Sequence, residues 1–131
     1  MKTTTRWKKD MVFDSHQGDN KILLDGSRQK GFNPKALMLS ALAGCSGIDV
    51  VDILEKMRVK FDNLEIDVEA IQTDEHPKVF KEITITYKIN APVNEEDKVK
   101  KAIELSLDKY CGVSAMLKKT SAINYKIILE L

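Results

Sequence analysis

The chain contains two cysteines, Cys45 and Cys111, and their thiols are the side chains best suited to carry chemistry. As a thiolate, a cysteine attacks peroxides and disulfides, and a second thiol can then close a disulfide with it. Because glutathione and thioredoxin keep ordinary cytoplasmic thiols reduced, such a disulfide is transient in that compartment. The two residues predict a redox thiol pair, and the alternative for each of them is an inert buried cysteine.

The neighbours of both cysteines favour reactivity. Glycine and serine flank Cys45 and leave the backbone around it bare, which would let a substrate or a second chain come close. Each glycine costs a helix up to about 1 kcal/mol relative to alanine, so another interaction has to offset that cost. Cys111 stands between two helical patterns, where free N–H groups at a helix start and the nearby Lys109 would favour the thiolate.

Binding of metal or nucleic acid is not expected. The two histidines, His16 and His76, are far from the cysteines in sequence and show none of the paired spacings of a zinc site. The 21 basic and 20 acidic residues give a formal net charge of +1, and no basic block is present that would neutralise several phosphates at once.

The composition is that of one ordinary globular domain over residues 1–131, because 43% of the residues are hydrophobic and 31% are charged. The first residues turn polar and charged again after Trp7, unlike the apolar region of a signal peptide. No apolar run is expected to reach membrane-spanning length. We therefore expect a cytoplasmic protein without a membrane segment.

The elements that must position the thiols begin with a predicted N-terminal hairpin. Strand-forming residues from Trp7 to Phe13 and the apolar run Lys21–Asp25 flank a cluster of turn residues at 14–20. After a break at 25–27 and a flexible stretch, Asn33 can cap a helix and Pro34 suits its first turn.

A long helix over Lys35–Met57 is predicted to carry Cys45. Its first half is apolar on every face, whereas its second half has charged residues on one side only. A small domain buries a modest fraction of its surface and can hardly enclose such a helix alone. A second subunit is expected to cover it, so the chain is predicted to form a homodimer.

Strands and helices alternate irregularly in the rest of the chain. Strict apolar/polar alternation over Leu64–Ala70 and Ile83–Ile89 predicts antiparallel strands with one face in water. A second helix is expected to open with a cap at Asn94–Asp97, followed by a short helix at Val113–Leu117 and a last strand at Ile123–Leu129. This order lacks regular βαβ alternation, so the predicted fold class is α+β.

Two segments resemble a known family. Residues Asn33–Cys45, followed by Ile48–Leu54, are similar to the central helix of the OsmC/Ohr family, in which a proline-led apolar helix carries the first reactive cysteine. The segment Lys109–Val113 is similar to the one that holds the family's second cysteine. Element order and length agree over nearly the whole chain, and the sequence most resembles the OsmC-like branch whose activity is poorly defined.

The resemblance implies an OsmC-like fold, with antiparallel sheets around the long central apolar helix, in an intertwined homodimer whose two sites draw on both subunits. It also implies a thiol peroxidase that reduces organic hydroperoxides in oxidative stress defence. Cys45 would attack and become a sulfenic acid, and Cys111 would resolve it as a disulfide. A dithiol, in Ohr-type members a lipoyl group on another protein, would restore the enzyme, and no metal or bound cofactor would be required.

The chain departs from the better-known peroxidases of this family at two positions. Those proteins pair an arginine of the N-terminal hairpin region with a glutamate in the first turn of the central helix, and this pair keeps the first thiol ionised. Here Lys35 occupies the glutamate position, and the loop at 15–20 contains no arginine. A cation is still needed because only the thiolate attacks efficiently. The candidates are Lys35, His16 and Arg28, and the alternative for each is a solvated surface residue.

Asp49 lies one helical turn after Cys45, on the same face of the predicted helix. Its carboxylate would oppose thiolate formation unless a cation lay between them. The plainer alternative is a hydrogen-bonded polar contact at the subunit boundary.

A second function stays open on the same fold. A non-catalytic OsmC-like dimer could bind a small hydrophobic molecule in the apolar cleft between its subunits, or sense oxidation through its thiols. The replacement of the activating glutamate and arginine favours this alternative.

Overall fold

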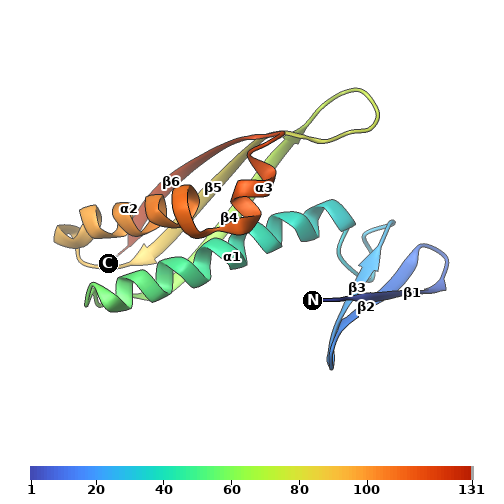
Figure 1. The fold of residues 1–131 in the computed structure, drawn as a ribbon, viewed down its shortest axis with the longest axis horizontal. Coiled ribbons are helices and arrows are strands. Elements are labelled where there is room, and N and C mark those ends of the chain that lie inside the picture. The colour runs from blue at the N-terminus through green and yellow to red at the C-terminus, as the bar shows by residue number, and fades with distance from the viewer. Residues whose placement is uncertain (131) are drawn as a thin grey trace. The chain divides into compact units, whose positions relative to one another are not determined.

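The computed structural model describes residues 1–130, and in this part of the chain it has two three-stranded sheets and three α-helices (Figure 1). The predicted α+β class is confirmed. The chain divides into two compact units, the first formed by Met1–Met38 and the second beginning at Leu39. Each unit contains one of the sheets.

The first unit is built on an antiparallel sheet in the order β1 (Thr4–Lys9), β2 (Val12–Gln17) and β3 (Asn20–Asp25). The predicted hairpin is therefore wrong by one strand. Most of the polar segment at 14–20, which we expected to form a turn, belongs to the central strand β2. Its backbone pairs with a neighbour on each side, and this pairing outweighs the turn preference of its polar residues.

The turns of this sheet are shorter than expected. Asp10 and Gly18 adopt positive φ angles of 52° and 59°, which lets the chain reverse between β1 and β2 and between β2 and β3. After β3 the buried carboxylate of Asp25 accepts hydrogen bonds from the Ser27 hydroxyl at 2.7 Å and from the Lys30 backbone N–H at 2.9 Å. These bonds lower the pKa of Asp25, the Ser27 hydroxyl contributing most, and they close the following loop.

Helix α1 (Pro34–Lys56) begins and ends within one residue of the prediction. Asn33 Oδ1 accepts a hydrogen bond from the Lys35 backbone N–H at 3.0 Å, so the predicted cap is confirmed, and Pro34 is the first helical residue. By length and composition alone α1 could cross a membrane, which corrects the expectation that no apolar run reaches that length. Burial in the protein core explains part of its apolar composition, because residues on one side of the helix are fully buried there.

The second unit has a mixed sheet of β4 (Asp62–Gln72), β5 (Phe80–Asn90) and β6 (Ala122–Glu130). The central strand β5 is antiparallel to β4 and parallel to β6. A parallel partner requires the chain to cross over, and the helices between β5 and β6 form that connection. The predicted strand pair and the predicted last strand are confirmed.

Alternation along β5 separates a dry face from a wet one. Ile83, Ile85 and Ile89 are fully buried on the first face. On the other face Lys88 Nζ lies 2.8 Å from Asp67 Oδ2 and forms an ion pair with β4. The prediction of strands with one face in water is confirmed.

Helix α2 (Glu96–Leu105) follows a 3₁₀ turn at Val93–Glu95. The prediction that Asn94 caps this helix is wrong. Asn94 lies inside the 3₁₀ turn, because the Glu95 backbone N–H donates to the Pro92 carbonyl at 2.9 Å and closes that turn before the helix begins. The acidic first turn was predicted correctly.

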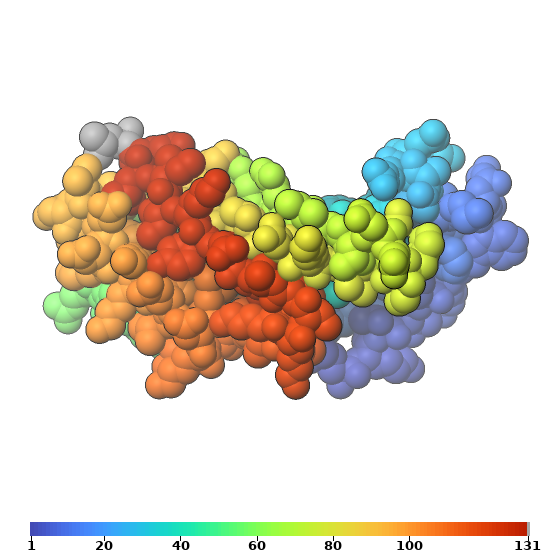
Figure 2. Space-filling view, turned by 90° about the horizontal axis from the view of Figure 1, so that it is seen from above, coloured from blue at the N-terminus to red at the C-terminus, as the bar shows by residue number. Residues whose placement is uncertain are grey.

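Helices α1 and α2 lie against the dry face of the second sheet (Figure 1), and buried residues of both join that face in one core cluster. Figure 2 looks onto the opposite face of the sheet, where the strands hide most of α1. Tyr125 of β6 donates a hydrogen bond to Glu104 of α2 at 2.9 Å, which ties that helix to the sheet.

We predict that Ile85→Ala lowers the free energy of unfolding by about 2 to 5 kcal/mol, because it leaves a cavity under the two helices. Ile128→Ala on β6 is the matched control, since this side chain is 44% exposed. It should change the free energy by no more than about 0.5 kcal/mol. Urea denaturation followed by circular dichroism measures both, and equal effects would contradict the assignment of the dry face.

Candidate functional site

The two predicted site cysteines both lie in the second unit, as free thiols. Cys45 is half-buried in the middle of α1, and it packs against the core cluster. Cys111 is only 4% exposed and lies between a π-helical turn at Ser106–Tyr110 and helix α3 (Gly112–Leu117). The predicted interruption of the helix at Cys111 and the short helix after it are confirmed.

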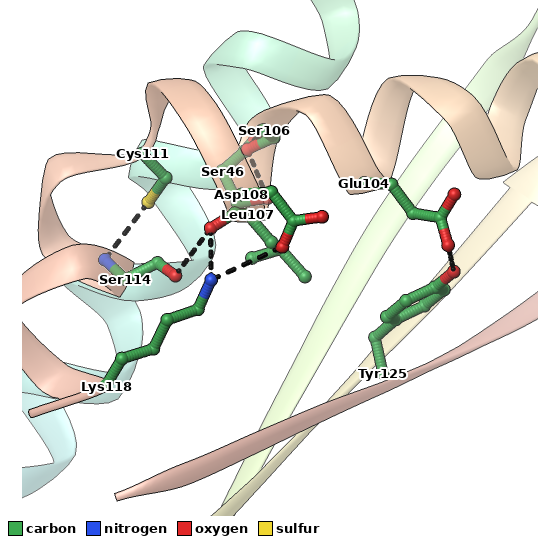
Figure 3. A network of polar contacts seen from close by, with 9 residues as sticks. All are labelled: Ser46, Glu104, Ser106, Leu107, Asp108, Cys111, Ser114, Lys118 and Tyr125. Carbon is green, nitrogen blue, oxygen red and sulfur yellow. Dashed lines mark hydrogen bonds and ion pairs between the residues drawn. The ribbon is translucent and has the colours of Figure 1, made fainter. Parts of the chain in front are cut away.

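Cys111 is the N-cap residue of α3. Its Sγ accepts a hydrogen bond from the Ser114 backbone N–H at 3.3 Å (Figure 3), as a serine or aspartate side chain does in other caps. Its own backbone N–H donates to the Ser106 carbonyl at 2.7 Å, five residues earlier, and this bond closes the π-helical turn. Turns of this kind are frequent at functional sites because they change the direction of the side chains that follow.

Burial raises the pKa of the Cys111 thiol to about 11, although the Ser114 N–H lowers it. The neighbouring Cys45 thiol and the charge of Asp49 raise this pKa further. The expectation that the helix start and Lys109 make Cys111 easy to ionise is therefore wrong, because desolvation outweighs one hydrogen bond. The Lys109 ammonium instead lies 5.4 Å from the ring centre of Tyr110. Because Cys45 and Cys111 interact through a side-chain hydrogen bond, the two thiols lie next to one another.

A chain of buried polar groups lies next to the thiol pair. Tyr87 OH of β5 is 2.6 Å from Ser46 Oγ of α1, and Ser46 Oγ is 2.9 Å from Ser106 Oγ. Ser106 Oγ also lies 2.9 Å from Asp49 Oδ2, one turn after Cys45 on α1. Asp49 thus has the hydrogen bond that we considered for it, to a residue of its own chain, and its place at a subunit boundary stays a prediction. Burial raises the pKa of Tyr87 to about 12, so its hydroxyl stays protonated.

Sequence reasoning missed Ser46, Tyr87 and Ser106. Ser46 follows Cys45 directly, so its position was the one available signal. Tyr87 and Ser106 are 41 and 60 residues away from it in sequence, and neither belongs to a recognisable motif. Serine and tyrosine at alternating or helical positions are indistinguishable from ordinary core-facing residues until the strands and helices are assembled.

The segment that carries Cys111 is fixed from its other side by a second set of contacts. The Leu107 carbonyl accepts hydrogen bonds from Ser114 Oγ at 3.2 Å and from Lys118 Nζ at 2.5 Å (Figure 3). Lys118 Nζ also lies 3.5 Å from Asp108 Oδ1. These bonds tie α3 and the residue that follows it to the π-helical turn.

The three predicted activating cations belong to the first unit. His16 Nε2 lies 3.0 Å from Asp14 Oδ1, on strand β2. Arg28 adopts a positive φ of 64° in the loop after Asp25, and Lys35 is in the first turn of α1. Their role in activating Cys45 stays a prediction. Among residues 1–130 no group of three histidine, cysteine or acidic side chains could hold a metal ion.

An open apolar groove of about 660 Å³ lies between α1 and β4. A Cβ added to Gly47 would lie 3.0 Å from Ile66 Cδ1 of β4, whereas one added to Gly44 would meet no described atom within 4 Å. Helix α1 therefore comes close to β4 at Gly47 and not at Gly44. Ile48, also in the groove, is 73% exposed.

Comparison with known proteins reveals a family and a relative. The sequence pattern of the family described as OsmC-like protein matches residues 26–126. Protein YhfA of Escherichia coli strain K12 is 33% identical over 128 residues, which cover 95% of this chain and 95% of that protein.

Solved structures share the fold. The OsmC-like protein of Mycoplasma pneumoniae superposes with a TM-score of 0.88 at 22% identity, over 99% of this chain and 96% of its own. The organic hydroperoxide resistance protein OhrB of Bacillus subtilis gives a TM-score of 0.66 at 18% identity, over 96% of each chain. At these identities the likeness concerns the fold alone.

We predict that iodoacetamide labels Cys111 slowly at neutral pH, because its buried thiol stays protonated there. Labelling should accelerate about tenfold per pH unit from about pH 7 to about pH 10, since only the thiolate reacts. Quenched labelling with peptide mass mapping measures the rate at Cys111 alone. A rate that levels off below about pH 9 would show that the thiol ionises at its ordinary pKa, contrary to this prediction.

Proposed function

The chain belongs to the OsmC-like protein family, and from that premise we propose that it is a thiol peroxidase that reduces organic hydroperoxides with Cys45 and Cys111. The observation that carries this proposal is the pairing of the two thiols, which come from sequence positions 66 residues apart and interact with one another beside α1. The name of the Bacillus subtilis relative, an organic hydroperoxide resistance protein, supports the substrate class.

The two thiols differ in the way that this reaction requires. Cys45 is half-buried and can meet a substrate, whereas Cys111 is buried and protonated. The Cys45 thiolate attacks the outer oxygen of the hydroperoxide, the O–O bond breaks, and the alkoxide leaves as an alcohol after it takes a proton. Cys45 becomes a sulfenic acid. Cys111 then attacks its sulfur, a disulfide forms and water leaves.

The proposal includes a reductant and a setting. A dithiol, supplied by a lipoylated protein, would reduce the disulfide and release both thiols for another cycle. No metal or bound cofactor takes part in these steps. The protein would act in the cytoplasm in defence against oxidative stress, where a reducing environment returns the pair to the dithiol state. One of Lys35, His16 and Arg28 would supply the cation that keeps Cys45 ionised.

A homodimer is part of the same proposal. Ile48 is 73% exposed in the single chain. Gly44, Gly47 and Val51 of the same helix line the groove beside it. A large apolar side chain beside such a surface is typical of a protein interface. A second copy that covers this side of α1 would enclose the helix, as its apolar sequence requires.

The groove beside α1 favours a second candidate function, the binding of a small hydrophobic molecule. Its volume of about 660 Å³ lies within the range of ligand pockets, and Val51, Leu64 and Ile66 give it an apolar wall. Under this alternative the thiols would sense oxidation or remain inert.

We predict that the protein consumes cumene hydroperoxide in the presence of dihydrolipoamide, and that Cys45→Ser abolishes this turnover. Cys111→Ser should still form the sulfenic acid once, and dimedone should trap it at Cys45, because the resolving thiol is missing. Coupled turnover assays and intact mass measure both results. Unchanged turnover in Cys45→Ser, or no oxidation of either thiol by one equivalent of hydroperoxide, would refute the peroxidase proposal.

For the second candidate we predict that decanoic acid raises the melting temperature of the protein through the groove. Gly44→Leu should abolish this rise by filling the groove, and it should itself stabilise α1 by up to about 1 kcal/mol, since leucine favours a helix over glycine. Differential scanning fluorimetry measures both effects. An equal rise in the unaltered protein and in Gly44→Leu would exclude the groove as the binding site.

A further inference from the structure

Helix α3 begins at a sulfur atom. Its N-cap is Cys111, whose Sγ accepts the backbone N–H of Ser114 at 3.3 Å. The first N–H groups of a helix have no partner within the helix, so the cap has to supply one. Ser114 is fully buried, and in the part of the chain that the structure describes the Cys111 sulfur is the one acceptor of its N–H. Water therefore cannot reach this N–H while α3 keeps its position.

The cap lies beside the other thiol. The Cys111 backbone N–H donates to the Ser106 carbonyl at 2.7 Å, and the Ser106 hydroxyl donates at 2.9 Å to Oγ of Ser46, the residue directly after Cys45. One fully buried residue thus links the backbones around the two cysteines. The two thiols also interact directly through a side-chain hydrogen bond. The sulfur that caps α3 therefore has its disulfide partner next to it.

Disulfide formation draws the capping sulfur away from Ser114. Both cysteines are free thiols in this state, and their sulfurs have to approach to about 2.05 Å for the bond to form. Within a helix the χ1 rotamer near +60° is rare, which restricts the sulfur of Cys45 on α1. The backbone of Cys111 is extended, with φ −75° and ψ 104°, and this restriction does not apply to it. The Cys111 side chain therefore makes the approach by rotating toward Cys45.

The far end of α3 is held by bonds that do not involve the sulfur. Lys118 Nζ donates to the Leu107 carbonyl at 2.5 Å, and Leu117 packs in the core cluster (Figure 3). The Ser114 hydroxyl donates to the same carbonyl at 3.2 Å, and it can exchange this partner for water when the first turn moves. Loss of the cap therefore affects the first turn of α3, while its last turn stays attached.

We propose that Cys111 is a redox-dependent cap of α3, which holds the helix closed as a thiol and releases its first turn as one half of the disulfide with Cys45. The inference rests on the proposed function for its physiological oxidant. A buried N–H without an acceptor is unfavourable, so the turn moves until water reaches Ser114. The thiol of Cys111 is only 4% exposed in the closed state. Opening would thus admit the dithiol that reduces the disulfide.

The cap changes partner within a balanced cycle. The Cys111 sulfur attacks the sulfur of the Cys45 sulfenic acid, the S–S bond forms, the S–O bond breaks, and the thiol proton leaves with hydroxide as water. The Ser114 N–H then donates to water instead of sulfur. In the reduction, one thiolate of the dithiol attacks the disulfide and its second thiol closes a disulfide of its own. Cys45 and Cys111 regain their protons, and the cap forms again.

Amide hydrogen exchange followed by NMR measures the state of the cap. Diamide, which removes two hydrogens from a thiol pair and becomes a hydrazine, replaces the hydroperoxide, and intact mass verifies the disulfide. Exchange at the Ser114 N–H should be about 10- to 100-fold faster in the disulfide state than in the dithiol state, since the N–H has lost its acceptor. Ile103, fully buried in α2, is the internal control, and its exchange should not change.

Variants of the two cysteines separate the sulfur from the helix. Cys111→Ser supplies a capping hydroxyl that cannot form a disulfide, so Ser114 should stay protected with and without diamide. Cys111→Ala has no acceptor, and its Ser114 should exchange without oxidant as fast as in the disulfide state of the unaltered protein. Cys45→Ser is the matched control. It keeps the sulfur cap but cannot form the pair, and diamide should leave its Ser114 exchange unchanged.

Equal exchange at Ser114 in the dithiol and disulfide states would overturn the proposal, as would a Cys111→Ala variant in which Ser114 is as protected as in the unaltered protein. Should Cys111→Ala fail to fold, the two states of the unaltered protein provide the decision. If diamide opens α3 but hydroperoxide is not consumed, the proposed function alone is refuted. If hydroperoxide is consumed and Ser114 is equally protected in both states, the redox-dependent cap alone is refuted.

Discussion

The arrangement of this site depends on the cost of burying polar groups. An unpaired hydroxyl in an apolar core costs about 1 to 3 kcal/mol, and Ser46, Tyr87 and Ser106 are all fully buried. Each of them avoids that cost by bonding to a residue of another element, and Asp49 completes the set. The hydrogen bonds of these groups join helix α1, strand β5 and the π-helical turn before Cys111. The same packing brings the two thiols next to one another.

Burial has opposite consequences for the two thiols. Cys45 retains access to solvent, whereas Cys111 is enclosed by the π-helical turn and α3, so its thiol is held protonated although it caps a helix. Desolvation outweighs the single hydrogen bond from Ser114, and a nearby carboxylate adds to the effect. A protonated second thiol is protected from direct oxidation until the first has reacted, which suits a resolving role better than an attacking one.

The opposite side of α1 carries small residues and borders the groove. Gly47 lets the helix approach Ile66 of β4 closely, while Gly44 and the exposed Ile48 border an open groove. The inward face of α1 combines core residues Leu42, Val50 and Leu54 with the hydrogen-bonded Ser46, and the outward face borders an open groove. The helix has the length and composition of a membrane span, and one side of it is buried in the core of the protein.

Local sequence patterns predicted most of the elements and both candidate thiols. Periodicity, the cap at Asn33 and the alternation in β5 are local, so they predicted helix α1, the second sheet and the α+β class. Central strand β2 was missed because pairing on both sides overrode its turn-like composition. Only the assembled structure shows that Ser106 contacts Asp49, that Tyr87 contacts Ser46, and that Cys111 is buried. Contacts between residues 41 to 60 positions apart, and the desolvation that they cause, leave no trace in local sequence.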